Sequence, residues 1–450
     1  MSAVKAERYA AYKDSGVEWL REVPGNWRTL RLKDVIEKLE SGVSVNASDE
    51  PATGNNIGVL KTSCVGKDSF IPDENKSVWP TELNRVSTPV RAGRIIVSRM
   101  NTPQLVGASA YVPKNYPNIF LPDRLWQTVF FSSVRLDSKW LSLLIGCKDF
   151  RYLLSTVATG TSPSMKNLGQ DKFLSISIPF PSHAEQTAIA TYLDTKTAQI
   201  DRQIDLLGQK ATQYGKLKQS LINETVTRGL DKSVPMKDSG VEWIGEVPEN
   251  WDIRRIKEIF IESKSKSLKG NEDLLSVSEY TGVTLKQDNV GEDEFLTNAA
   301  SLIGYKLCKI GDLVINIMLA WKRGLGVSAY YGIASPSYAV YTPQKEINSS
   351  FFHYRLRNED AIAEFKRNST GIIESRLRLY SDSFYALSIA VPPLDEQTAI
   401  AAYLDEKSEK IDRIIDTINT QIYKLKDLRK ALINDVVTGK IKVGSEGQTI

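Results

Sequence analysis

The chain has 450 residues, of which 41% are hydrophobic and 25% are charged. These proportions are typical of a globular protein long enough for at least two domains. Its 58 basic and 54 acidic residues leave a net charge of +4, which excludes a generally basic nucleic-acid binder, so any basic surface must be local. Three scattered cysteines without a CxxC motif favour buried thiols in a reducing compartment. Neither a secretory signal nor a membrane-spanning run is evident, so we expect a cytoplasmic protein.

A sixteen-residue motif occurs twice. It reads YKDSGVEWLREVPGNW at residues 12–27 and MKDSGVEWIGEVPENW at residues 236–251, and the copies share 12 residues. Gly16 and Pro24 favour turns, and the tryptophans provide large apolar surfaces. We expect an arm that docks on the rest of the chain and carries no catalytic group.

Two long stretches, residues 185–227 and 396–438, are near copies at a constant offset of 211 residues, without a gap. Both place apolar residues at alternating steps of four and three, the spacing of a coiled-coil seam, with one 3-3 slip near the end. As helices they would each be roughly 65 Å long. The predicted seam residues are Ile200, Ile204, Leu207, Ala211, Tyr214, Leu217 and Leu221 in the first stretch, and Ile411, Ile415, Ile418, Ile422, Leu425, Leu428 and Leu432 in the second.

A seam of this length needs a partner that covers it. Homodimerisation is the usual solution, but the best-matched partner lies in the same chain, so we expect intramolecular pairing. Ser182 and Glu185 have the spacing of a capping box before the first helix, and Asp395 can cap the second. Gly229 and Gly439 are expected to end the helices.

The segments between arm and helix differ in sequence but share landmarks. GRIIVSRM (93–100) and GDLVINIM (311–318) each predict a turn and a buried strand. Both segments close with an apolar strand that ends at proline, LSISIPFP or LSIAVPP, and helices are expected at Trp140–Tyr152 and Phe351–Phe365. The predicted class is therefore mixed α/β (α+β), in the order arm (1–27), variable domain (28–181), helix (182–230), arm (231–251), variable domain (252–393), and helix with tail (394–450).

The sequence lacks the motifs of catalysis. His183 and His353 are the only histidines, and neither has the spacing of a metal ligand. There is no GxxxxGK[ST] phosphate loop, and no GxGxxG follows a strand. FPSH and VPPL do not match the tetrapeptide of adenine methyltransferases, and no Glu-x-Lys follows Pro72-Asp73 to complete a nuclease motif. We expect neither a metal site nor a catalytic residue.

The doubled arm, the doubled PxxxEQTAIAxYLD opening and the doubled LINxxVT end of the helices together resemble the specificity (S) subunits of type I restriction-modification enzymes. The resemblance covers nearly the whole chain. It implies two target recognition domains, each reading one half of a split, asymmetric DNA sequence, and two antiparallel helices that act as a ruler between them. Such an arrangement has approximate two-fold symmetry, which suits the symmetry of duplex DNA.

The resemblance also implies partners that carry the chemistry. Two modification subunits would methylate adenine with S-adenosylmethionine, and restriction subunits would cleave DNA with ATP and Mg. The chain itself would hold no cofactor and would be a non-catalytic, DNA-binding subunit of a host-defence system.

Candidate DNA contacts lie in loops after the shared strands. In the first domain Arg99, Asn101 and Gln104 carry groups that pair with guanine and adenine edges in the major groove. Arg124 and the Ser162–Asn167 loop with Lys166 are further candidates. Equivalent places in the second domain give Trp321, Lys322, Arg323, Arg376, Arg378 and Tyr380. Phosphate contact is favoured over base contact for Lys166 and Lys322, because lysine is a flexible point charge.

Two other functions remain open at this point. A stand-alone regulator that binds a bipartite DNA site would have the same architecture without methyltransferase partners, and co-purification with a methyltransferase separates the two. An interaction scaffold that never touches DNA would show no salt-dependent binding to mixed duplexes. The sequence sets neither the target sequence nor the spacer length, because loop geometry decides which side chain meets which base.

Overall fold

The computed structural model describes residues 7–17, 19–66, 69–162, 164–289 and 301–444. Glu18 of the first arm, Pro163 of the predicted Ser162–Asn167 loop and both ends of the chain lie outside these ranges. Contacts divide the chain into two units, one of residues 1–207 with 420–450 and one of residues 208–419. Each unit contains one arm, one β-rich domain and one part of each long helix.

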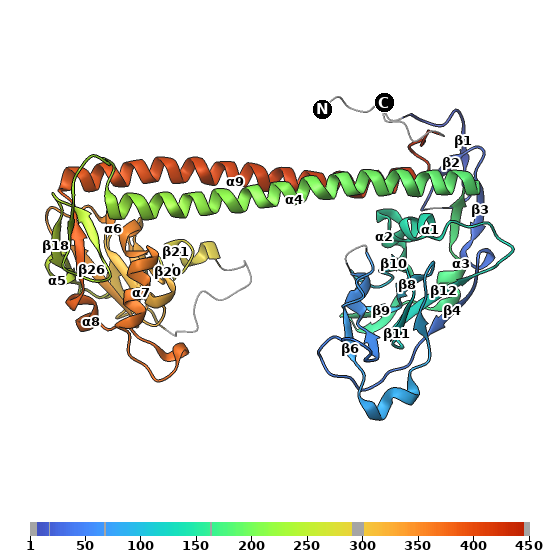
Figure 1. Cartoon of the computed structure of the whole chain (residues 1–450), viewed down its shortest axis with the longest axis horizontal. Helices are drawn as coiled ribbons and strands as arrows, with labels where there is room; N and C mark the ends of the chain where they lie inside the picture. Colours follow the sequence, from blue (N-terminus) through green and yellow to red (C-terminus); the bar gives the residue numbers. More distant parts are fainter. Residues whose placement is uncertain (1–6, 18, 67–68, 163, 290–300, 445–450) are drawn as a thin grey trace. The chain divides into compact units, whose positions relative to one another are not determined.

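The two long helices predicted from the repeat are present as α4 (His183–Arg228) and α9 (Leu394–Val437), drawn green and red in Figure 1. In the first unit the start of α4 lies beside the end of α9, where Asp201 binds Arg429 at 2.9 Å. In the second unit the end of α4 lies beside the start of α9, where Lys218 binds Asp412 at 2.7 Å. The residue numbers of each pair (201 with 429, 218 with 412) add up to 630, so the pairing is antiparallel and has one register in both units.

The two ion pairs are copies of each other. Asp412 lies 211 residues after Asp201, and Arg429 lies 211 residues after Lys218, so each repeat supplies one acid and one base. Because these side chains are partly exposed, each pair stabilises the fold only modestly. A shift of one helix along the other would separate both pairs at once, so together they favour this register over its neighbours.

The predicted seam residues are shielded from solvent except at one place in each helix. Leu217 and Leu428, at equivalent positions, are 54% and 55% exposed, so the prediction that they belong to the seam is wrong. The next residue, Lys218 or Arg429, takes the place, which restores alternating steps of four and three and removes the slip. The aliphatic stems of Lys218 and Arg429 cover the seam while their charged heads reach aspartates of the other helix. The other predicted members are buried or partly buried.

Most of the predicted helix ends are confirmed. Ser182 Oγ accepts a hydrogen bond from Glu185 N at 3.3 Å. Asp395 does not cap α9, because the helix begins one residue earlier and places this carboxylate inside the first turn. Gly229 and Gly439 follow the helices with left-handed φ angles of +74° and +79°, which only glycine adopts without strain.

Each arm is a short hairpin, β1 (Tyr12–Asp14) with β2 (Glu22–Pro24), or β16 (Met236–Asp238) with β17 (Glu246–Pro248). Trp27 and Trp251, which follow the hairpins, are fully buried, so the arms do cover apolar surface. In the first unit a Cβ on Gly439 would lie 2.5 Å from Pro24 and 3.1 Å from Trp27. Glycine at this place lets the arm close over the end of α9.

The first β-rich domain is built on an antiparallel sheet in the order β10-β8-β12-β4, with the strands β4 (Ile36–Ser41), β8 (Ile95–Ser98), β10 (Ser109–Tyr111) and β12 (Leu125–Phe130). All four residues of β8 are buried, as predicted for residues 93–100. A second sheet has the order β6-β5-β11-β7, with β5 (Gly58–Leu60), β6 (Asn75–Ser77), β7 (Pro89–Val90) and β11 (Tyr116–Phe120). The predicted closing strand, β15 (Ser177–Phe180), follows α3 (Gln170–Ser175) and pairs with β3 (Arg28–Arg31).

The second β-rich domain repeats this plan, with fewer paired strands among its described residues. Its main sheet has the order β19-β26-β23-β24, with β19 (Phe260–Glu262), β23 (Leu313–Asn316), β24 (Leu325–Val327) and β26 (Tyr338–Pro343). Two smaller sheets pair β20 (Leu275–Ser278) with β21 (Gly282–Leu285) and β22 (Lys306–Cys308) with β25 (Gly332–Ala334). The closing strand β27 (Ser388–Val391) pairs with β18 (Asp252–Arg255), and the short helices are α5 (Ile256–Ile259) and α8 (Ser381–Ala386).

The helix predicted in each domain is in fact two helices. The Trp140–Tyr152 prediction corresponds to α1 (Ser138–Gly146) and α2 (Lys148–Val157), and the Phe351–Phe365 prediction to α6 (Ser349–Leu356) and α7 (Glu359–Arg367). Cys147 and Asn358 have extended backbones and break the helices. The first N–H groups of a new helix need partners from elsewhere, and the long helices contribute some of these partners.

Each domain has its own core, and the ends of the long helices are part of it. Ile189 of α4 and Val437 of α9 are buried in the core of the first domain. Their repeat equivalents, Ile400 of α9 and Val226 of α4, are buried in the core of the second. The three cysteines are buried, as predicted. The long helices are therefore built into both domains.

A charge reversal tests the register. Lys218→Asp is expected to lower the free energy of unfolding by about 1 kcal/mol, because two carboxylates then face each other across the seam. Adding Asp412→Lys to the same chain recreates the pair with opposite polarity and should recover most of the loss. Urea unfolding of both single variants and the double variant gives the coupling energy. A double variant whose loss equals the sum of the single losses would show that the pair does not act across the helices.

Candidate nucleic-acid interface

Two amide side chains join the first domain to the long helices. Gln186 of α4 is fully buried, accepts a hydrogen bond from Asp137 N at 2.9 Å and donates one to Pro181 O at 3.0 Å. Asn434 of α9 accepts a bond from Asp149 N at 3.1 Å and donates one to Asp149 Oδ2 at 3.0 Å. The domain therefore contacts α4 at the start of α1 and α9 at the start of α2.

The second domain is held in the same way with the helices exchanged. Gln397 of α9 accepts from Asn348 N and donates to Pro392 O, both at 2.8 Å. Asn223 of α4 accepts a hydrogen bond from the Asn358 amide at 2.7 Å, just before α7. The glutamine of each EQTAIA motif and the asparagine of each LIN motif are therefore the polar joints between helix and domain.

The glutamate of the EQTAIA motif has a different partner, the arm. Glu185 Oε1 accepts a hydrogen bond from Tyr9 OH at 2.6 Å, and burial together with this carboxylate raises the pKa of Tyr9. In the second unit Glu396 Oε2 accepts from the Asn250 amide at 3.0 Å. Two adjacent residues of one motif thus fix the arm and the domain to the same helix turn.

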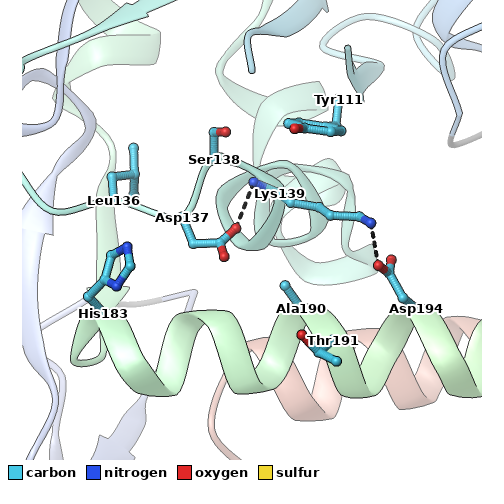
Figure 2. Close-up of a pocket in the computed structure, with 9 residues that line it drawn as sticks. All are labelled: Tyr111, Leu136, Asp137, Ser138, Lys139, His183, Ala190, Thr191 and Asp194. Carbon is cyan, nitrogen blue, oxygen red and sulfur yellow. Dashed lines mark hydrogen bonds and ion pairs between the residues drawn. The ribbon is translucent and has the colours of Figure 1, made fainter. Parts of the chain in front are cut away.

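A cavity of about 400 Å³ lies at the joint of the first domain, between β10, α1 and the start of α4 (Figure 2). Asp137 caps α1 by accepting hydrogen bonds from Lys139 N and Trp140 N, both at 3.0 Å. The Lys139 ammonium points along the cavity and binds Asp194 of α4 (Figure 2). These polar groups hold the domain on the helix, so the cavity is part of the joint.

The structure brings together the predicted contact residues of the first domain. They gather on a small antiparallel sheet made of β13 (Thr159–Ser162), β14 (Met165–Asn167) and β9 (Met100–Asn101). Asn101 lies opposite Lys166 in this sheet. Arg124 joins them through its backbone, because Arg99 N donates to Arg124 O at 3.0 Å. Segments predicted separately therefore share one surface.

The side chains on this surface differ in what they can offer a ligand. Arg124 and Gln104 are exposed, and Lys166 is partly exposed. The Arg99 guanidinium lies 5.8 Å from the ring centre of the buried Trp126. The amide of Asn101 is used inside the loop, where it accepts from Thr102 N at 2.9 Å and donates to Ser98 Oγ at 3.2 Å.

Sequence reasoning missed a residue that shapes this loop. Arg151 of α2 donates to Val106 O at 2.8 Å and to Gln104 O at 3.1 Å. These bonds hold the loop that follows β9 against the helix. Nothing in the sequence distinguishes Arg151 from an ordinary solvent-facing arginine on a helix, because its carbonyl partners are about 45 residues away in the chain.

Both domains carry a hairpin at equivalent places. In the first, Thr159 pairs with Asn167 between β13 and β14. In the second, Thr370 and Arg378 exchange two backbone hydrogen bonds of 3.0 Å, and both residues lie 211 positions after their counterparts. We call residues 159–167 the first hairpin and residues 370–378 the second hairpin.

Each hairpin is tied to the buried strand in the same way. Leu168 N donates to Arg99 O at 2.8 Å in the first domain, and Leu379 N donates to Ile317 O at 2.9 Å in the second. The residues that follow the strand and those of the hairpin therefore lie together in both domains. The two domains therefore share this backbone arrangement, which we call the frame, whereas the sequences of the hairpins differ.

In the second domain the ring of Trp321 packs against the ammonium groups of lysine side chains. It is only 9% exposed, and its indole N–H donates to Met318 O at 3.0 Å. The ammonium groups of Lys322 and Lys366 lie 4.8 and 5.4 Å from its ring centre. Lys366 also binds Glu374 of the second hairpin at 2.5 Å, and this hydrogen bond lowers the pKa of the Glu374 carboxyl. Lys366 was not among the predicted contacts, because its ring partner is distant in the chain.

The remaining predicted residues of the second domain fall into two groups. Arg323 has a left-handed φ of +64° and binds Glu359 at 3.3 Å, so its charge is used within the domain. Arg376 and Tyr380 are exposed on the second hairpin and just after it, and Arg378 is partly exposed. These last three have surface that a ligand can reach.

The buried titratable groups have structural roles. His353 accepts a hydrogen bond from Val327 N at 3.2 Å, and burial and Arg357 lower its pKa to about 4, so the ring is neutral. Burial raises the pKa of Cys147 and Cys308 to about 12, so both are thiols at neutral pH. Among the described residues, no group of three or more His, Cys, Asp or Glu side chains could hold a metal ion.

The chain matches the type I restriction modification DNA specificity domain twice, over residues 24–210 and 248–424. Each match begins at the end of an arm and runs through one β-rich domain into a long helix. Together the two matches cover most of the chain. The chain belongs to this specificity family.

Individual specificity subunits are similar to all or part of the chain. The MjaVIII specificity subunit of Methanocaldococcus jannaschii is 23% identical over 446 residues, which cover 94% of both chains. The EcoEI specificity subunit of Escherichia coli is 27% identical over 174 residues, which cover 38% of this chain and 29% of that one. The first of these similarities includes both repeats.

Two solved structures share the fold. A chain from a study of complex assembly and conformational transition of the type I R-M system has a TM-score of 0.62 and 15% identity, covering 92% of this chain and 98% of that one. The HsdS subunit of Thermoanaerobacter tengcongensis has a TM-score of 0.52 and 16% identity, covering 93% and 98%. In the described ranges, no helix combines the length and apolar content needed to span a membrane.

The joint of a specificity-family domain is tested by Gln397→Ala. The change leaves a buried N–H and a buried carbonyl without their partner, which is expected to cost about 1–3 kcal/mol of unfolding free energy. Gln421→Ala, at an exposed place on the same helix, is the matched control and should cost only a few tenths. Hydrogen exchange should speed up at Asn348 and the start of α6 in the first variant only. Equal exchange in both variants would contradict the role of the buried amide.

Proposed function

We propose that this chain is the DNA-specificity subunit of a type I restriction-modification enzyme, with one recognition domain for each half of a bipartite, asymmetric target. The observation that carries the proposal is the pair of equivalent hairpins, each bonded through its backbone to the end of the equivalent buried strand, with different sequences in the two domains. A shared frame with different loops suits two readers of the same kind with different specificities. Membership in the specificity family supports this role.

The proposed readers are residues 28–181 and 252–393. On the first, Gln104, Arg124 and Lys166 offer groups to DNA, and on the second Lys322, Arg376, Arg378 and Tyr380 do so. We assign positioning roles to Asn101, Trp321 and Arg323, because their polar or aromatic groups are engaged within their own domains. Arg99 belongs with the positioning group, since its guanidinium packs on a buried ring.

The chemistry of methylation and cleavage is assigned to partners. Two modification subunits would bring S-adenosylmethionine to adenine, and restriction subunits would bring ATP and Mg. Support for two copies of one partner comes from Leu217 and Leu428, which are exposed to the same degree at equivalent places on α4 and α9. An exposed leucine on a helix is a small apolar patch that a partner can cover.

Methylation mapping tests the proposal. A host without other systems that expresses this chain and its genomic methyltransferase partner should carry methylated adenines in one bipartite motif. The purified chain alone should neither transfer methyl groups nor cut DNA. Replacing residues 28–181 with the corresponding domain of a relative should change one half-site only, because the second reader keeps its own frame. A motif that changed in both halves, or no motif at all, would refute the assignment.

Helix length is expected to set the number of unread base pairs between half-sites. Seven residues inserted after Gln209 and seven after Thr420 extend both helices at matched points of the observed register, so pairs on either side are kept. Each helix gains roughly 10 Å, which corresponds to at most about three base pairs of spacer. The mapped motif should keep its half-sites and gain spacer. The insertion in α4 alone is the control, since it leaves seven residues of α4 without a matching stretch of α9. A double-insertion chain that is active and keeps the original spacer would contradict the proposal that helix length sets the spacer.

A further inference from the structure

The tip of the second hairpin is apolar and exposed. Ile372 is 98% exposed and Ile373 is 54% exposed. Figure 1 shows the segment between α7 and α8 as an orange loop that protrudes from the second domain. Removing two adjacent isoleucines from water is favourable, so this tip has binding free energy to offer that the folded chain itself does not use.

The hairpin presents the isoleucines on a structured loop. Its base is closed by the two backbone bonds between Thr370 and Arg378. Beyond the tip the chain makes one 3-10 turn (Glu374–Arg376), in which Arg376 N donates to Ile373 O at 2.9 Å. The ion pair between Lys366 and Glu374 ties this turn to α7. The loop therefore loses little conformational entropy when its tip binds a partner.

Cationic side chains lie on the second hairpin and beside it. Arg376 follows it on the exposed turn, and Arg378 lies at the base. Lys322 and Lys366 gather on Trp321, next to Glu374 of the hairpin. Two aliphatic side chains projecting from a cationic surface match the chemistry of duplex DNA, whose phosphates flank an apolar stack of bases.

We propose that Ile372 and Ile373 insert into one base-pair step of the half-site read by the second domain, and that the step is selected by how easily it unstacks. The proposal rests on the proposed function. Insertion exchanges base stacking for burial of the isoleucines, and it is easiest at pyrimidine–purine steps, which deform most readily. The domain would then read a position at which it makes no hydrogen bond to a base edge.

The first hairpin provides a contrast within the same chain. The residues equivalent to Ile372 and Ile373, at the offset of 211, are Thr161 and Ser162. Threonine and serine are polar, so the same insertion would gain much less from burial. Positions 161 and 162 therefore lack the apolar wedge that positions 372 and 373 provide, and unstacking by this part of the hairpin is expected in the second half-site only.

The experiment uses the full chain with its modification subunits and a duplex that carries the mapped motif. 2-Aminopurine replaces adenine at successive positions of both half-sites, because its fluorescence rises when it is unstacked. The wild-type complex should raise the fluorescence at one step of the second half-site and at none of the first. Ile372→Thr with Ile373→Ser, which copies the first hairpin, should abolish the rise and weaken binding about tenfold.

Two further variants separate insertion from loss of fold or charge. Ile372→Leu with Ile373→Val keeps the apolar tip and should keep the fluorescence rise. Arg376→Gln should reduce the salt dependence of binding by about one phosphate contact, whereas the Thr/Ser variant should leave that slope unchanged.

The outcomes distinguish this proposal from the proposed function. A wild-type complex that binds the motif specifically but unstacks no base would overturn the wedge and leave the specificity role intact. A Thr/Ser variant that binds DNA like the wild type but loses its modification subunits would overturn it too, and would make the tip a protein-docking surface. Absence of any methylated motif would refute the proposed function instead.

Discussion

The antiparallel register of α4 and α9 is the constraint on which the rest of the structure depends. Each unit takes the start of one helix and the end of the other, so the units do not coincide with the repeats of the sequence. The core of the first domain, for example, needs Ile189 from the first repeat and Val437 from the second. A repeat cut out of the chain would leave its whole helix seam and part of its domain core without partners. Correct register is therefore a condition for either domain to be complete.

The two ion pairs show how a repeat enforces its own register. The basic members of the pairs, Lys218 and Arg429, lie at seam positions where an aliphatic residue would pack equally well at several offsets. Because acid and base lie 17 residues apart within each repeat (Asp201 and Lys218), only one antiparallel offset satisfies both pairs. The modest strength of each pair suits this role, since specificity requires that wrong registers be worse rather than that the right one be very stable.

The joints divide the molecule into a fixed frame and variable tips. Glutamine, glutamate and asparagine of the doubled motifs each contact a different neighbour, namely the domain, the arm and the second short helix. These contacts involve backbone groups or side chains at domain edges, so the loops can change without disturbing them. The candidate DNA contacts Arg99, Asn101 and Trp321 also make side-chain contacts within their own domains. Charge in a loop is therefore a weak guide to contact unless its internal partners are known.

The sequence by itself indicated the order of arms, domains and helices, most of the seam and of the helix ends, and the buried strands β8 and β23. These features follow from local periodicity and from a repeat without gaps, which are both readable along the chain. It also brought forward candidate loop segments, because the buried strand that precedes them recurs in both halves. Only the tertiary structure decided that Lys218 rather than Leu217 completes the seam, since the choice depends on an aspartate in the other helix. Partners distant in the chain likewise explain the helix breaks at Cys147 and Asn358, the hydrogen bonds from Arg151 to a loop, and the packing of lysines on Trp321. Whether a side chain stabilises the fold or faces a ligand therefore depends on its partners rather than on its residue type.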